Sequence, residues 1–123
     1  MLTTALLLHT PPEKEYFFDE GCYILELSNT THDADVSIAQ ARVKPGVTTH
    51  WHYLLDVVER YVILSGHGVV DVDNLTAQEV SPGSVVLIPA GCRQRISNHS
   101  DEDLIFLAIC SPRFTPACYH SLS

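Results

Sequence analysis

The chain has 123 residues, which suffices for one domain and leaves no room for a second core of ordinary size. Its apolar content of 46% is that of a globular protein and excludes a disordered tail or a fibrous repeat. Acidic residues outnumber Lys and Arg by 15 to 7, giving a formal net charge of −8. Nucleic acids and anionic membranes bind clustered basic residues, so neither is expected as a partner.

The N-terminal segment contains an apolar run, Ala5–Leu8, that is too short to cross a bilayer. It lacks the basic start and cleavage site of a secretory signal. We therefore expect an N-terminal strand or an arm that docks on a partner subunit, with a frayed tail as the alternative. The four cysteines form no CxxC pair, which favours reduced thiols and a cytoplasmic location.

Short apolar segments separated by turn signals fill the rest of the chain. Pro45-Gly46 and Pro82-Gly83 are typical of turns, because Pro fixes φ at the first central position and Gly accepts a positive φ at the second. This pattern predicts an all-β sandwich or closed barrel. A short turn of helix is expected at residues 119–121. The predicted strands cover residues 22–27, 36–43, 59–64, 68–73, 78–80, 84–88, 93–97 and 104–110.

Three side chains near the middle of the chain suggest a metal site. His50 and His52 are two residues apart, so in a strand they point to the same face. A hairpin would bring Glu59 back beside them, and two imidazoles with one carboxylate form the facial triad of non-haem Fe(II) oxygenases. A carboxylate inside a barrel also needs a cationic partner. The alternative interpretation is a pair of histidines that are exposed at a strand edge or packed in the core.

Two longer patterns resemble the motifs of the cupin superfamily, G(X)5HXH(X)3,4E(X)6G and G(X)5PXG(X)2H(X)3N. The first is matched by His50, His52, Glu59 and Gly66, and the second by Gly83, Pro89, Gly91 and Asn98. The chain thus resembles small single-domain cupins. The resemblance implies one all-β cupin-type β-barrel (a double-stranded β-helix or jelly roll) over residues 1–123, with the motifs at about 46–66 and 83–98.

The sequence departs from these motifs at two places. Gly46 precedes His50 by three residues instead of five, and six residues instead of three or four separate His52 from Glu59, so Asp56 is a fallback carboxylate. Gln94 stands where the family has its third histidine. It either coordinates through its amide oxygen or hydrogen-bonds a metal-bound water or the substrate.

The resemblance implies a divalent metal held by His50, His52, Glu59 and Gln94, with Fe(II) or Mn(II) favoured over Zn(II) or Ni(II). We expect a metal-dependent enzyme acting on a small organic substrate, with dioxygenase chemistry favoured over isomerase or lyase chemistry. Tyr61 would supply a proton or a hydrogen bond. The alternative is a non-catalytic module that binds or senses a small ligand through a degenerate metal site. A homodimer is expected, with Trp51 outside the barrel beside Val62 and Leu64.

Overall fold

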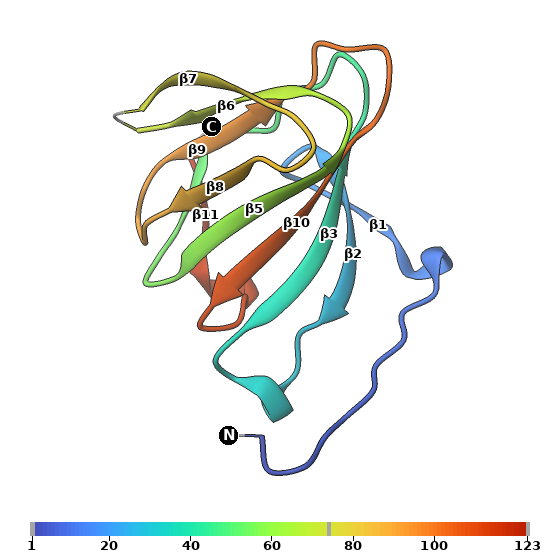
Figure 1. Cartoon of the computed structure of the whole chain (residues 1–123). Helices are drawn as coiled ribbons and strands as arrows, with labels where there is room; N and C mark the ends of the chain where they lie inside the picture. Colours follow the sequence, from blue (N-terminus) through green and yellow to red (C-terminus); the bar gives the residue numbers. More distant parts are fainter. Residues whose placement is uncertain (1, 74, 123) are drawn as a thin grey trace.

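The computed structural model describes residues 2–73 and 75–122. Their strands form two antiparallel sheets that face each other (Figure 1). The first sheet has the spatial order β1 (Tyr16–Phe18), β2 (Cys22–Ser28), β3 (Ser37–Val43), β10 (Leu104–Ser111), β5 (Val58–Ser65) and β8 (Val85–Ile88). The second has the order β11 (Tyr119–Ser121), β4 (His52–Leu54), β9 (Gln94–Ser97), β6 (Gly68–Val72) and β7 (Leu75–Val80). Short 3-10 turns occur at η1 (Pro12–Lys14), η2 (Thr31–Asp33) and η3 (Pro116–Cys118).

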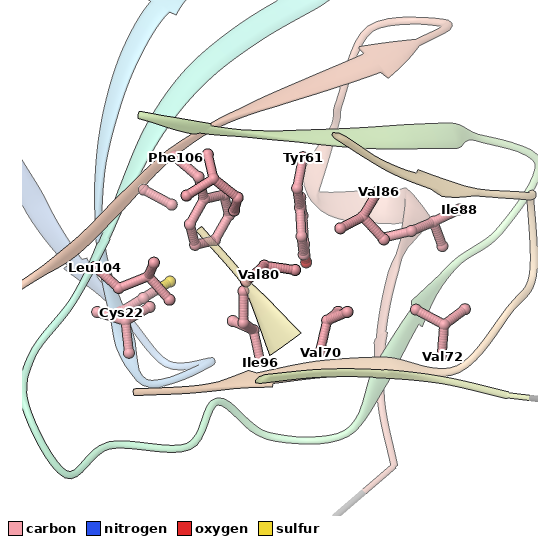
Figure 2. Close-up of a cluster of buried hydrophobic side chains, with 13 residues drawn as sticks. Cys22, Tyr61, Val70, Val72, Val80, Val86, Ile88, Ile96, Leu104 and Phe106 are labelled. Carbon is pink, nitrogen blue, oxygen red and sulfur yellow. The ribbon is translucent and has the colours of Figure 1, made fainter. Parts of the chain in front are cut away.

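The core lies between the sheets and follows from the alternation of side chains along the strands. On β5 the inward residues are Glu59, Tyr61 and Ile63, as the pattern predicts, and all three are buried. The ring of Tyr61 reaches from β5 toward the facing sheet, with Phe106 to one side (Figure 2). Burial of each large apolar side chain of this kind contributes about 1.5–3 kcal/mol. The all-β prediction is confirmed.

The two predicted Pro-Gly turns are present. Gly46 and Gly83 have φ angles of 80° and 96°, in the left-handed region that glycine adopts without strain. The first turn precedes the segment that carries His50 and His52, and the second precedes β8. These turns therefore set where the motif-bearing segments begin.

The predicted helical turn at residues 119–121 is wrong. This segment is strand β11, in which Tyr119 pairs with Leu54 and Ser121 with His52 of β4. The short strand β4 offers unpaired backbone groups at the sheet edge, and satisfying them outweighs a weak local helical preference. The pairing also brings the Tyr119 ring to the interior side of β4.

The N-terminal segment forms an arm, because residues 2–11 contain no helix or strand. Leu7 on this arm is 96% exposed, and the arm runs outside the two sheets (Figure 1). Trp51 does not lie beside Val62 and Leu64, since its ring packs under the guanidinium of Arg95 on the five-stranded sheet, 4.6 Å from the ring centre. Within residues 2–73 and 75–122, no helix has the length and apolar character needed to cross a membrane.

Candidate functional site

A cavity of about 60 Å³ lies against the inner face of the six-stranded sheet. Its apolar wall comes mainly from β2, β3 and β10, and includes Ile24, Ala39, Ala41, Phe106 and Ala108. Its polar groups come from the turn before β2 and from β2, β4 and β5, and include Glu20, Glu26, His52, Glu59 and Tyr61. Titratable side chains that sit beside an apolar wall are typical of a catalytic or ligand-binding cavity.

His52 is the first residue of β4, and three neighbours fix its ring. Its Nδ1 lies 2.8 Å from the backbone carbonyl oxygen of His50. Its Nε2 lies 3.3 Å from Oε1 of Glu20. The Tyr119 ring stacks on the imidazole at 5.1 Å with an interplanar angle of 25°. The side chain therefore has one position and presents one nitrogen to Glu20.

These contacts determine how protons are arranged in the Glu20–His52 pair. A backbone carbonyl only accepts hydrogen bonds, so Nδ1 of His52 must carry a hydrogen. In the neutral ring Nε2 then bears a lone pair that faces the Glu20 carboxyl group, and one proton is shared between the two. Burial lowers the pKa of His52. Burial, and then the charge of Glu59, raise the pKa of Glu20 to about 8, so the shared proton resides on Glu20 at neutral pH.

Glu20 was not singled out from the sequence. It lies in the turn between β1 and β2, where Gly21 has a φ of 107°, and its carbonyl oxygen accepts a hydrogen bond from the backbone nitrogen of His50 at 2.8 Å. This bond ties the turn to the segment that precedes β4. No motif or periodicity marks Glu20, because its position depends on a contact between segments thirty residues apart.

Glu59 enters the cavity from β5 and is 7% exposed. Oε2 of Glu59 lies 3.7 Å from the thiol of Cys110, while Oε1 has no hydrogen-bond partner among the described residues. Burial raises the pKa of Glu59 to about 7, although the side chains of Gln94 and Cys110 oppose the shift. An unpartnered buried carboxyl oxygen is costly, so its presence beside a cavity suggests that a ligand satisfies it.

Tyr61 and Gln94 complete the polar cluster. The hydroxyl of Tyr61 donates a hydrogen bond to Oε1 of Gln94, and both residues are buried. Gln94 lies directly opposite His52 in the pairing of β9 with β4. Burial raises the pKa of Tyr61 well above its usual value, so the phenol stays protonated. Oε1 of Gln94, which the sequence offered as a metal ligand, thus accepts a hydrogen bond from Tyr61.

The structure does not bring the predicted metal ligands together. The shared face of His50 and His52 stays a prediction: β4 begins at His52, which is buried, and the His50 side chain is exposed. Asp56 is exposed in a turn with a φ of 59°. In the described part of the chain, no group of three His, Cys, Asp or Glu side chains is arranged to hold a metal ion. The facial triad of His50, His52 and Glu59 therefore does not fit this geometry.

Two facing sheets around a buried polar cavity define a double-stranded β-helix protein. The family model described as "Cupin domain" matches residues 39–110, which is more than half of the chain. The chain belongs to the cupin family. A search of the curated proteins found no match.

Solved structures of the same fold include proteins with named activities. KdgF from Halomonas sp. has a TM-score of 0.79 at 14% identity, with 93% of this chain and 99% of that chain covered. Pac13 of Streptomyces, described as a nucleoside dehydratase, has a TM-score of 0.77 at 15% identity, with coverage of 97% and 92%. Oxalate decarboxylase of Lactobacillus farciminis has a TM-score of 0.75 at 24% identity, with coverage of 89% and 34%. At these identities the likeness shows the fold alone.

Proposed function

We propose that the chain is an acid–base enzyme of the lyase or isomerase type that acts on a small organic molecule in the barrel cavity. The observation that carries this proposal is the Glu20–His52 pair, which shares a proton in the same cavity as the unpartnered Oε1 of Glu59. One group that can give a proton thus lines the same small space as one that can take a proton. Enzymes assign the roles of acid and base to two groups by placing them in surroundings that shift their pKa values differently.

In an elimination of water, the Glu59 carboxylate takes the proton from a carbon atom of the substrate. The electron pair of that C–H bond forms the carbon–carbon double bond, and the neighbouring C–O bond breaks. The Glu20–His52 pair gives its proton to the departing hydroxyl group, which leaves as water. Proton exchange with solvent then returns Glu59 and the pair to their starting states. The Tyr61 hydroxyl lines the cavity and gives its hydrogen to Gln94, so its oxygen accepts a hydrogen bond from the substrate.

The names of two structural neighbours support lyase chemistry. Pac13 is described as a nucleoside dehydratase, and the Lactobacillus farciminis protein is an oxalate decarboxylase. Dehydration and decarboxylation both break a bond to carbon without net oxidation of the substrate by dioxygen. We propose the same class of reaction for the present chain, and we do not assign it the substrates of these two proteins.

The metal-dependent dioxygenase predicted from the sequence stays a separate hypothesis, with Fe(II) or Mn(II) as the metal. It requires the His50 side chain, which is exposed, to act together with His52 and Glu59. The acid–base enzyme requires only the backbone carbonyl of His50. The His50 side chain therefore discriminates between the two hypotheses.

The test compares His50→Ala with His52→Ala. Metal content is measured on the purified proteins, and uridine and a panel of small hydroxylated compounds are then incubated in D2O and followed by ¹H NMR. We expect deuterium incorporation or a new olefinic signal with wild type and His50→Ala, unchanged by a chelator, and at least a 100-fold slower reaction with His52→Ala. Turnover that needs Fe(II) or Mn(II), consumes dioxygen and fails equally in both variants would contradict the proposal. Tight ligand binding without any turnover would favour a non-catalytic module.

We also propose that the protein acts as a cytoplasmic homodimer. The arm and the outer face of the six-stranded sheet carry exposed apolar side chains, among them Leu7 and Leu87. Exposed apolar surface of this kind is typical of an interface between subunits.

A further inference from the structure

The cavity wall carries three glutamate side chains, and its only basic side chain among the described residues is the imidazole of His52, which already faces Glu20. Within the described residues, its lining includes Glu20, Glu26 and Glu59 and contains no Lys or Arg. Three of the five arginines form ion pairs with carboxylates on strands and turns outside this lining, at Arg42, Arg93 and Arg95. The cavity therefore offers no cationic side chain to an incoming anion.

A neighbouring depression that shares lining residues with the cavity contains a guanidinium group. Arg113 lines that depression, and its Nη1 donates a hydrogen bond to Oδ1 of Asn29 at 2.9 Å. Asn29 contributes to both spaces, whereas Arg113 contributes only to the outer one. A negatively charged group in the inner cavity would lose its water without gaining a positive partner, at a cost of several kcal/mol.

The unpartnered Oε1 of Glu59 points to the chemistry that the cavity accepts. This side chain is more than nine-tenths buried and lines the cavity, and none of the described residues donates a hydrogen bond to that oxygen. Glu20 already contacts Nε2 of His52 through its Oε1, and Oε1 of Glu26 accepts a hydrogen bond from Tyr16, so the carboxyl oxygen left for a ligand to satisfy belongs to Glu59. A neutral hydroxyl group supplies the missing donor and leaves the charge of the site unchanged.

We propose that the cavity binds a neutral, hydroxyl-bearing compound through Glu59 and rejects compounds whose reacting end is an anion. This proposal rests on the proposed function, because it names the class of substrate for the same cavity. The hydroxyl group donates to Oε1 of Glu59, and the carbon skeleton lies against the apolar wall that includes Ile24 and Ala108. Dicarboxylates are therefore poor substrates for this chain.

The test uses three probes that share a three-carbon skeleton: glycerol, serinol and glycerate, which are neutral, cationic and anionic. Each is titrated into isotopically labelled protein at one pH and ionic strength, and the NMR signals of His52, Gln94 and Ala108 are followed. We expect glycerol to bind at least 10-fold more tightly than glycerate. We expect Glu59→Leu, which removes the acceptor and keeps a side chain of similar size, to weaken glycerol binding about 5-fold or more, because one buried hydrogen bond contributes on the order of 1 kcal/mol. Glu79→Gln, which alters an exposed carboxylate on β7 of the other sheet and outside the cavity lining, is the matched control and keeps the affinity of wild type.

Three results would overturn the proposal: glycerate bound as tightly as glycerol, serinol bound most tightly, or no probe perturbing the cavity signals. The titration measures occupancy and not turnover, so it separates this proposal from the previous one. Tighter binding of glycerate would reject the neutral substrate class. It would not affect the acid–base roles, which the comparison of His50→Ala with His52→Ala tests separately. Preference for glycerol, with no reaction of any hydroxylated compound, would support the ligand class and contradict the enzyme.

Discussion

At the scale of single residues, the position of one proton decides what the site can do. The carbonyl of His50 fixes the hydrogen on Nδ1 of His52, and stacking on Tyr119 fixes the plane of the ring. Nε2 can then exchange a proton only toward Glu20 and the cavity. A ring held this way does not need to turn before it transfers a proton, which removes a reorganisation cost from the reaction.

Replacing Glu20 by Gln tests whether that proton is used. The amide can still donate a hydrogen bond to Nε2, so the ring keeps its Nδ1–H tautomer and the fold is retained. The amide cannot give up a proton, so we expect kcat to fall about 100-fold. Ring ¹⁵N NMR checks the tautomer and steady-state kinetics measure the loss. Glu79→Gln changes an exposed carboxyl on β7 of the other sheet, outside the cavity, and should react normally. Full activity of Glu20→Gln would remove Glu20 from the mechanism.

The two buried carboxyl groups also predict how stability depends on pH. The pKa of Glu59 is about 7 in the fold, against an ordinary value of 4.5, and Glu20 is shifted in the same direction to about 8. Between pH 4.5 and 8 the folded protein binds more protons than the unfolded chain, so the free energy of unfolding falls as the pH rises. Glu59 alone accounts for a loss on the order of 3 kcal/mol.

Urea denaturation at pH 5 and pH 8 measures this loss. Glu59→Gln should be nearly as stable as wild type at pH 5 and more stable than wild type at pH 8, because the amide has no charge to bury. The opposite slope, with wild type gaining stability toward pH 8, would mean that Glu59 is ionised and paired with a cation in the fold.

At the scale of secondary structure elements, local pattern predicts the long strands well. β5, β6, β9 and β10 begin and end within about two residues of their predicted bounds, because runs of residues that favour strands mark them. The inward direction of Glu59, Tyr61 and Gln94 follows from the same alternation.

The candidate site is less predictable, because it depends on contacts between distant elements. β4 has only three residues and begins at His52, so the alternation that would turn His50 inward does not extend that far. Glu20 reaches His52 from a turn between two other strands, and Tyr119 reaches it through the pairing of β11 with β4. A single sequence carries no local sign of either contact.

Gly66, where the sequence indicated the end of a strand, is held by packing as well as by its backbone angle. Its φ is 83°, and an added Cβ would lie 2.9 Å from Cα of Leu104 and still closer to the carbonyl oxygen of Asp103. Gly83 has a similar φ of 96° and open space around it. We expect Gly66→Ala to lower the free energy of unfolding by about 3 kcal/mol or more and Gly83→Ala to lower it by about 1 kcal/mol. Only the first substitution adds a steric clash to the strain of a left-handed backbone. Equal losses of unfolding free energy in chemical denaturation would show that backbone strain alone accounts for both effects.

At the scale of the whole molecule, the outer face of β10, β5 and β8 differs from the rest of an acidic chain. Across these strands Leu107 lies opposite Val62, which lies opposite Val85, and the next row is Ile109, Arg60 and Leu87. No acidic side chain points outward from these three strands, although the formal net charge is −8. Val85 and Leu87 are 56% and 71% exposed. A surface with these properties suits contact with a second copy of itself, because charge repulsion between the copies is weakest there.

Leu87→Asp tests this contact against a matched control, Leu75→Asp, which alters an exposed leucine on β7 of the other sheet. We expect light scattering at micromolar concentration to find a dimer for wild type and for Leu75→Asp. Leu87→Asp should raise the dimer dissociation constant 100-fold or more, because a two-fold interface contains the change twice and each buried leucine contributes about 2 kcal/mol. Equal weakening by both variants would attribute the effect to added negative charge on an acidic molecule. A monomeric wild-type protein would contradict the homodimer and leave the apolar face to another partner.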